Sequence, residues 1–106
     1  MKELIKDVTK LVNEELERTM KNYPLFNSKH EGYAVIKEEI DEASDELQNI
    51  NINLEIMWNV IKNNKNTNNF IYRLKDHAGL LAAEAIQVAA MAQKYIDSFK
   101  EAEINE

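Results

Sequence analysis

The sequence contains very little of the residues that break helices or bind soft metals. Its 106 residues include no cysteine, one proline and two glycines. Without cysteine, disulfides and thiolate metal sites are excluded. The two histidines, His30 and His77, are too few for a histidine-rich zinc site. Because proline and glycine interrupt regular structure, their scarcity favours long helices over a β fold with many turns.

Long apolar runs are also missing. No apolar stretch approaches the roughly 18 residues that a membrane span needs. The first residues, MKELIKDVTKLVNEEL, carry acids among the apolar side chains, which is not the pattern of a signal peptide. Apolar residues make up 44% of the chain and charged residues 30%, as in soluble globular proteins. We therefore expect a cytoplasmic protein with no membrane contact, folded as a single domain over residues 1–106.

The negative charge of the chain is concentrated in one segment. The formal net charge is −6, but the stretch from Glu38 to Ile61 holds seven acids and no base, so the rest sums to +1. Such a patch repels the phosphates of nucleic acids and anionic lipids, and it attracts cations or a basic protein surface. The sequence therefore predicts no direct binding to nucleic acid.

Start and stop signals divide the chain into helices. A first helix is expected from Lys2 to Lys21, because Pro24 cannot continue it. Ser28 followed three residues later by Glu31 forms a capping box, which predicts a second helix over Lys29–Asn63. An asparagine-rich run at 63–69 predicts a loop, after which Asn66 or Thr67 can cap a third helix.

Apolar residues recur with a seven-residue period along the second and third helices. The predicted core stripes are Tyr33, Ile36, Ile40, Ala43, Leu47, Ile50, Leu54, Met57 and Ile61, and then Ile71, Leu74, Ala78, Leu81, Ala85, Val88, Ala92, Tyr95 and Phe99. Trp58, Tyr33 and Tyr72 are expected in the core. A helix over 29–63 would be roughly 50 Å long, so it either breaks within 49–53 or packs on a second subunit.

These patterns together predict an all-α antiparallel helical bundle of three to four helices. The seven-residue repeats exceed what three helices of a compact monomer need. We therefore expect a homo-oligomer, either a homodimer or a homotetramer.

The acids of the second helix follow a line beside its apolar stripe. Glu39, Glu42 and Glu46 each precede a stripe residue, and Glu84 and Gln87 do the same on the third helix. If the two helices pack antiparallel, these lines face each other across a shallow groove. His77 lies two turns before Glu84 on the same line, where a histidine is more often structural than catalytic.

The crowding of acids between Glu38 and Glu46 has a cost. Three pairs lie at i,i+4 and three at i,i+3, which together destabilise the helix by on the order of 1–2 kcal/mol. A divalent cation would remove part of this penalty. Mg²⁺ suits carboxylate oxygens and keeps waters for substrate phosphates, and Mn²⁺ is possible. The alternative is a solvated acidic face, although Glu84 among alanines needs a cation, a donor or water.

The two motifs resemble those of a known family. Glu39-Ile-Asp-Glu42 and Glu84-Ala-Ile-Gln87 are similar to the Glu-x-x-Glu and Glu-x-x-Asp motifs of the MazG-like all-α nucleoside triphosphate pyrophosphohydrolases, which bind Mg²⁺. The resemblance covers about His30 to Phe99 and is greatest to a subgroup frequent in phages and prophages. The chain departs from the pattern at Gln87, where the family has an aspartate, so metal affinity should fall.

The resemblance implies a hydrolase that releases a nucleoside monophosphate and pyrophosphate. It implies these roles: metal ligands Glu39, Glu42, Glu84 and Gln87; a water-orienting carboxylate from Glu38 or Glu46; phosphate-binding Lys37 or Lys94. Two other functions stay open. In one, the groove binds a nucleotide or a nucleotide-derived signal without cleaving it; in the other, the acidic face binds a basic protein partner. The sequence does not identify the nucleotide.

Overall fold

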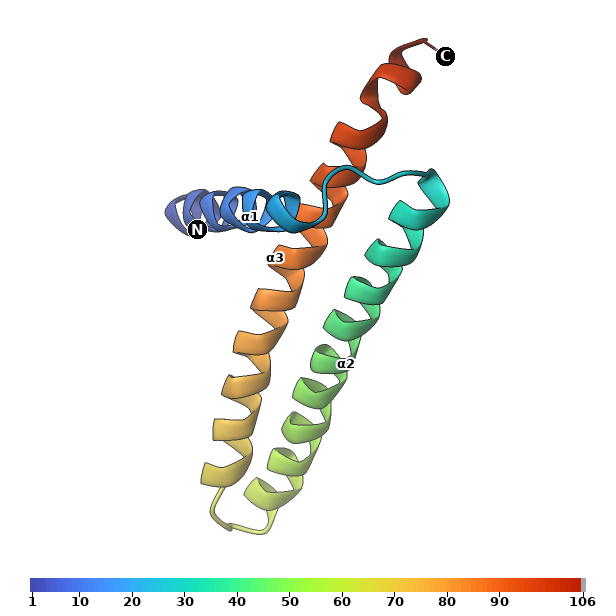
Figure 1. Ribbon diagram of the computed structural model, residues 1–106. Helices are drawn as coiled ribbons and strands as arrows, with labels where there is room; N and C mark the ends of the chain where they lie inside the picture. Colours follow the sequence, from blue (N-terminus) through green and yellow to red (C-terminus); the bar gives the residue numbers. More distant parts are fainter. Residues whose placement is uncertain (106) are drawn as a thin grey trace. The chain divides into compact units, whose positions relative to one another are not determined.

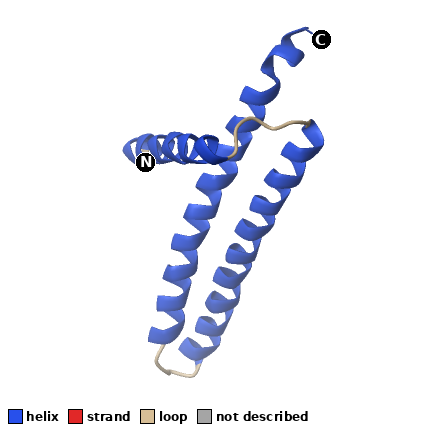
Figure 2. Cartoon of the chain, in the orientation of Figure 1, coloured by secondary structure: helices blue, strands red, loops and turns tan. Residues whose placement is uncertain are grey.

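The computed structural model describes the backbone of residues 1–105 and the side chains of residues 1–100 as three helices joined by two short connections (Figures 1 and 2). These are α1 (Lys2–Asn22), α2 (Lys29–Lys62) and α3 (Asn68–Asn105). No strand occurs in this part of the chain, which confirms the all-α class. None of the three described helices has a stretch that is both long and apolar enough to cross a membrane.

The helix ends lie where the local chemistry of the sequence places them. The backbone N–H of Glu31 donates to Ser28 Oγ at 3.1 Å, which is one half of the expected capping box. The Glu31 carboxylate accepts a hydrogen bond from Asn27 Nδ2 instead, at 3.3 Å. α2 then continues through 49–53 without interruption. Of the two alternatives for this long helix, a break within 49–53 is therefore wrong, and packing on a second subunit stays a prediction.

Asparagines form the connection between α2 and α3. Asn64 adopts a left-handed conformation with φ of 53°, which asparagine tolerates better than most residues. The side-chain oxygen of Asn66 accepts a hydrogen bond from the backbone N–H of Asn68 at 2.8 Å, where α3 begins. This contact confirms that Asn66 supports the start of the third helix.

The chain forms two compact units. The first contains residues 1–40 and 85–106, and the second contains residues 41–84. In the first unit, Phe26, Ala90 and Met91 are buried. Partly buried side chains pack around them: Val12, Leu16, Val35, Ile36, Tyr95 and Phe99. The expectation of a single domain over 1–106 stays a prediction.

Lys94 lies inside the first unit and fixes the connection between α1 and α2. Its side chain is 4% exposed, and Nζ donates to the Tyr23 carbonyl at 2.8 Å and lies 4.5 Å from the centre of the Phe26 ring. Burial lowers the pKa of Lys94 from its ordinary value of 10.5, while the charge of Glu31 opposes this shift. Ser98 Oγ accepts the Phe26 N–H at 3.0 Å, so two residues of α3 hold the connection.

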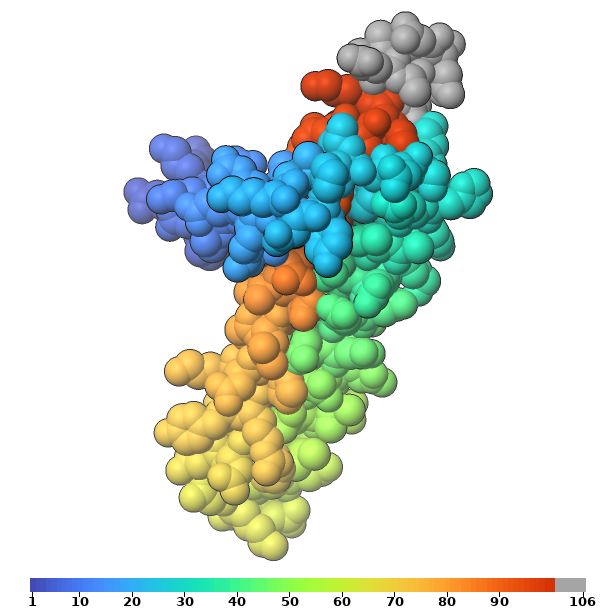
Figure 3. Space-filling model, viewed as in Figure 1, coloured from blue at the N-terminus to red at the C-terminus, as the bar shows by residue number. Residues whose placement is uncertain are grey.

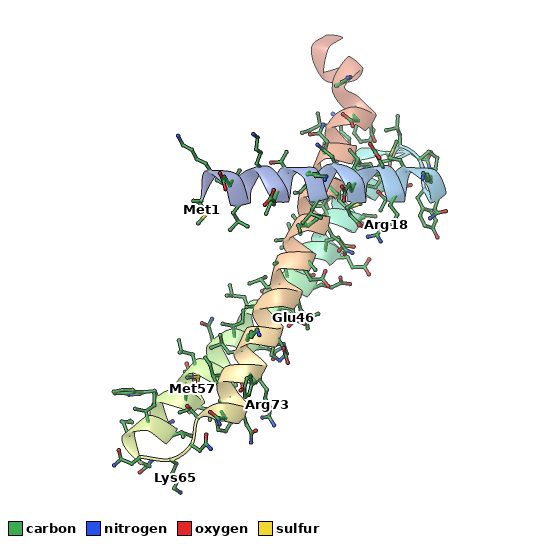
Figure 4. The ribbon with its side chains drawn as sticks, turned by 90° about the vertical axis from the view of Figure 1, so that its left-hand side faces the viewer. Met1, Arg18, Glu46, Met57, Lys65 and Arg73 are labelled. Carbon is green, nitrogen blue, oxygen red and sulfur yellow. The ribbon has the colours of Figure 1, made fainter. Side chains whose placement is uncertain are left out.

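The second unit is an antiparallel pair of helices, the loop-proximal parts of α2 and α3, whose side chains meet along their length (Figure 3). The helix residues of this unit that are buried or half-buried are Ala43, Glu46, Asn49, Ile50, Asn53, Met57 and Val60 on α2, and Phe70, Leu74, His77, Leu81 and Glu84 on α3. Figure 4 labels two of these residues, Glu46 and Met57. Asn53, which is 8% exposed, is the most buried residue of this unit.

In the second unit, one column of each predicted stripe is replaced by the residues one position earlier, whereas the other column is half-buried as predicted: Ala43, Ile50 and Met57 on α2, and Leu74 and Leu81 on α3. Leu47, Leu54 and Ile61 are 49%, 54% and 48% exposed. The residues one position earlier are half-buried or buried instead: Glu46, Asn53 and Val60. Polar residues can occupy these packed positions because they form hydrogen bonds there. Asn53 Nδ2, for example, donates to the Asn49 carbonyl at 2.8 Å.

The expectation that three aromatic side chains are in the core was wrong. Tyr33, Trp58 and Tyr72 are 67%, 59% and 63% exposed. Trp58 instead lies under the ammonium of Lys62, with Nζ 5.6 Å from the ring centre. Such an exposed cation–π contact stabilises the fold by less than about 1 kcal/mol, and it does not require burial of the ring.

The two glycines provide a matched test of the packing. A Cβ at Gly32 would lie 2.6 Å from Tyr95 Cδ2 and 3.2 Å from Phe26 Cδ2, whereas nothing lies within 4 Å of a Cβ at Gly79. We expect Gly32→Ala to destabilise the protein by about 1–3 kcal/mol through overpacking. Gly79→Ala should stabilise it by roughly 0.5–1 kcal/mol, because alanine is the better helix former.

Urea unfolding followed by circular dichroism measures both effects. Equal effects of the two glycine substitutions would contradict the close approach of Tyr95 to the α2 backbone.

Candidate functional site

Three carboxylates from the two predicted motifs gather at one place. Glu39 and Glu42 lie one turn apart on α2, and Glu84 lies on α3. Each offers one carboxylate oxygen, and these oxygens all lie within 4.8 Å of one another. No other group of three or more acidic, histidine or cysteine ligands of this kind occurs among the described residues.

Glu84 has the most perturbed environment of the acidic side chains. Burial raises the pKa of Glu84 above its ordinary value of 4.5, and a hydrogen bond with the Glu42 carboxyl and the charges of Glu42 and Glu46 raise it further. Its Oε2 is buried and accepts no hydrogen bond. The site therefore binds a proton more tightly than an isolated glutamate does, and it has a buried oxygen to offer to a cation.

Glu46 and His77 form a pair across the second unit. His77 Nδ1 lies 2.6 Å from Glu46 Oε2, and the two side chains are 29% and 22% exposed. Glu46 follows Glu42 by one turn of α2, and His77 precedes Glu84 by two turns of α3. The contact fixes the orientation of the Glu46 carboxylate, and its charge reaches Glu84.

The other predicted site residues lie in different surroundings. Glu38 and Lys37 are exposed, and Glu38 is about 100° around the helix from Glu39. Gln87 is half-buried one turn after Glu84. Lys94 is buried on the Tyr23 carbonyl. These contacts give Lys94 a structural role and do not favour its predicted role in binding phosphate.

The three carboxylates lie near enough to one another to converge on one cation. In an octahedral Mg²⁺ site with Mg–O bonds of about 2.1 Å, adjacent oxygens are about 3.0 Å apart and opposite oxygens about 4.2 Å apart. The oxygens of the triad lie within 4.8 Å of one another, so rotation of the side chains would have to bring them closer together around the ion. The buried Glu84 Oε2 is an additional feature that a cation would satisfy.

Of the residues at this site, His77 is the one whose contact was least predictable from the sequence. Its position on the line of Glu84 was visible in the sequence, but nothing in the pattern identified Glu46 as its partner. A pair separated by 31 residues depends on the register of α2 against α3. Only the packed helices determine that register.

The raised pKa of Glu84 predicts a pH dependence of stability. Between pH 4.5 and the raised pKa, the folded state binds more protons than the unfolded state, so the free energy of unfolding falls as pH rises through this window. We expect Glu84→Gln to be more stable than the unmodified protein at pH 7 without divalent cations. The difference should disappear near pH 4, where the carboxyl is protonated in both states.

Urea unfolding in EDTA at pH 4 and pH 7 measures this difference. Glu55→Gln is the control, because Glu55 is an exposed acid of the same unit, on α2 and outside the triad. A Glu84→Gln variant that is less stable than the unmodified protein at pH 7 would show that the carboxylate is satisfied in the fold.

Comparison of the chain with family models, with curated proteins and with solved structures found no match. The resemblance to the MazG-like enzymes therefore rests on the two motifs and on their place in an all-α chain. The features of the molecule that bear on its function are the acidic triad, the Glu46–His77 pair and the helices that hold them.

Proposed function

We propose that the protein is a Mg²⁺-dependent nucleoside triphosphate pyrophosphohydrolase that releases a nucleoside monophosphate and pyrophosphate. The observation that carries the proposal is the triad of Glu39, Glu42 and Glu84, whose oxygens lie within 4.8 Å of one another. The resemblance of the two motifs to the MazG-like family supports the same reading. The buried, unbonded Oε2 of Glu84 supports a cation rather than a solvated face.

The residues divide into two roles in this proposal. Glu39, Glu42 and Glu84 hold the cation, with the neutral amide oxygen of Gln87 one turn further along α3. The bound ion would grip the triphosphate and offset the charge that develops on it during attack by water. Deprotonation of Glu84 accompanies metal binding, because only the carboxylate form is a ligand. Lys37, exposed on α2, is left as the candidate for contact with a phosphate.

Of the two candidates for orienting the attacking water, Glu46 is favoured over Glu38. Glu46 is half-buried in the packed stripe and close enough for its charge to act on Glu84, whereas Glu38 is exposed on another face of α2. His77 holds the Glu46 carboxylate at 2.6 Å. A carboxylate fixed in this way can accept a proton from a water that lies beside the cation.

Gln87 favours a second candidate function. A site with three carboxylates and one neutral amide binds a divalent cation more weakly than a site with four carboxylates. The same groove would then hold a nucleotide or a nucleotide-derived signal without cleaving it. Calorimetry that shows nucleotide binding in Mg²⁺ without product would select this function, and the absence of binding would exclude both candidates.

Turnover tests the enzyme directly. Each NTP and dNTP is incubated with the protein and Mg²⁺ or Mn²⁺, and the monophosphate and pyrophosphate are separated by ion-exchange chromatography. We expect Glu42→Gln and Glu84→Gln each to lower the rate by about 100-fold or more, and Glu55→Gln to leave it unchanged. Loss of activity in the Glu55→Gln control, or full activity in both site variants, would refute the assignment.

Metal binding is tested separately from turnover by thermal unfolding. The unmodified protein should be stabilised by Mg²⁺, by about 2.7 kcal/mol when the ion is at 100 times its Kd. Glu84→Gln should lose most of this stabilisation, and Glu55→Gln should retain it. A melting temperature that does not respond to Mg²⁺ or Mn²⁺ would favour the third function, an acidic surface that binds a basic protein.

A further inference from the structure

The end of the second unit that carries the connection between α2 and α3 differs in composition from the rest of the unit. Residues 56–75 contain four bases and no acid, a charge of +4, together with three aromatic residues and six asparagines. The bases are Lys62, Lys65, Arg73 and Lys75. In Figure 4, Lys65 lies on the connection and Arg73 on the neighbouring part of α3. We call residues 56–75 the basic end.

The positive charges of the basic end are available to a partner. All four cationic residues are exposed. None of them forms an ion pair with a carboxylate within the part of the chain whose side chains are described. The nearest acids in the sequence, Glu55 and Asp76, border the segment on its two sides. An exposed group of cations of this kind attracts polyanions.

Two aromatic side chains of the basic end are also exposed. Trp58 is 59% exposed and Tyr72 is 63% exposed. Lys62 Nζ lies 5.6 Å from the centre of the Trp58 ring, and Arg73 follows Tyr72 in the sequence. The basic end therefore combines exposed rings with cations. Surfaces of this composition bind single strands, because a base can stack on a ring while a cation contacts the phosphate.

We propose that the basic end binds single-stranded nucleic acid. The four cations contact phosphates, and Trp58 and Tyr72 stack on bases. Exposed asparagines such as Asn64 and Asn69 add side-chain amides, whose donor and acceptor match the edges of bases. An acidic protein would use the charges alone, whereas a nucleic acid also uses the exposed rings. The aromatic side chains therefore favour nucleic acid over an acidic protein.

The acids of α2 are too distant to prevent this contact. The sequence predicted no direct binding to nucleic acid because residues 38–61 contain seven acids, but six of these lie between Glu38 and Glu46. Glu46 is about 24 Å along α2 from Lys62, at about 1.5 Å per residue. Surface charges are largely screened beyond about 10 Å at 0.1 M salt. The proposal therefore departs from the sequence-based expectation, and it does not depend on the proposed catalytic function.

Fluorescence anisotropy of a labelled oligothymidylate of about 15 nucleotides tests the proposal. EDTA in the buffer prevents Mg²⁺ from bridging the oligonucleotide to the acidic triad. Four phosphate contacts predict a slope of about −2.8 for the logarithm of the association constant against the logarithm of salt concentration. The double variant Lys65→Glu, Lys75→Glu should halve this slope and weaken binding by about tenfold or more. The matched control, Lys2→Glu with Lys6→Glu, changes the net charge equally at two exposed lysines of α1 and should bind as the unmodified protein does.

Intrinsic fluorescence of the unmodified protein tests the stacking directly, because Trp58 is the one tryptophan of the chain. The oligonucleotide should quench its emission, and Trp58→Leu should weaken binding by about tenfold without changing the salt slope. Absence of oligonucleotide binding at low salt, binding that leaves Trp58 emission unchanged, or an equal loss in the α1 control would overturn the proposal. Polyglutamate that binds as tightly as the oligonucleotide would also overturn it, in favour of an acidic protein partner.

Discussion

The second unit depends on the packing against α3 of a column of α2 that contains two polar residues, Glu46 and Asn53. A helix pair normally buries its most apolar stripe, but here Glu46 and Asn53 lie in the contact and Leu47 and Leu54 lie outside it. The arrangement is compatible with stability because Glu46 pairs with His77 and Asn53 bonds to a backbone carbonyl. It places the carboxylates together at the end of this contact, where Glu84 meets Glu42.

Placing Glu84 beside the other carboxylates destabilises its charged form, and it also creates a site that a ligand can occupy. Burial raises the pKa of Glu84 because the charged form loses water and faces other carboxylates. A structure that only needed stability would place an apolar side chain at this position. Acidic groups whose pKa is raised by burial and by neighbouring carboxylates are found at functional sites more often than elsewhere, because a bound ligand can stabilise the charged form. The acidic triad is therefore the feature of the molecule that most needs a functional explanation.

The first unit is organised differently. Its core of Phe26, Ala90 and Met91 is apolar, and Lys94, the one buried charge among the residues whose side chains are described, contacts a carbonyl and an aromatic ring. Lys94 therefore holds the connection after α1 against helix α3. Breaking such a contact leaves an ammonium without its partner, so Lys94 matters for stability even though it lies far along the chain from the connection it holds.

The sequence alone determined the helices, because caps, breakers and periodicity are local: Ser28, Pro24 and the asparagines at 63–69 set the ends that the structure has. It also identified Glu39, Glu42 and Glu84 as a group, since motif spacing fixes which residues share a helix face. It did not determine which of two adjacent columns faces the partner helix. Leu47 and Glu46 differ by one residue, and only the packing of α2 on α3, with His77 opposite Glu46, decides between them.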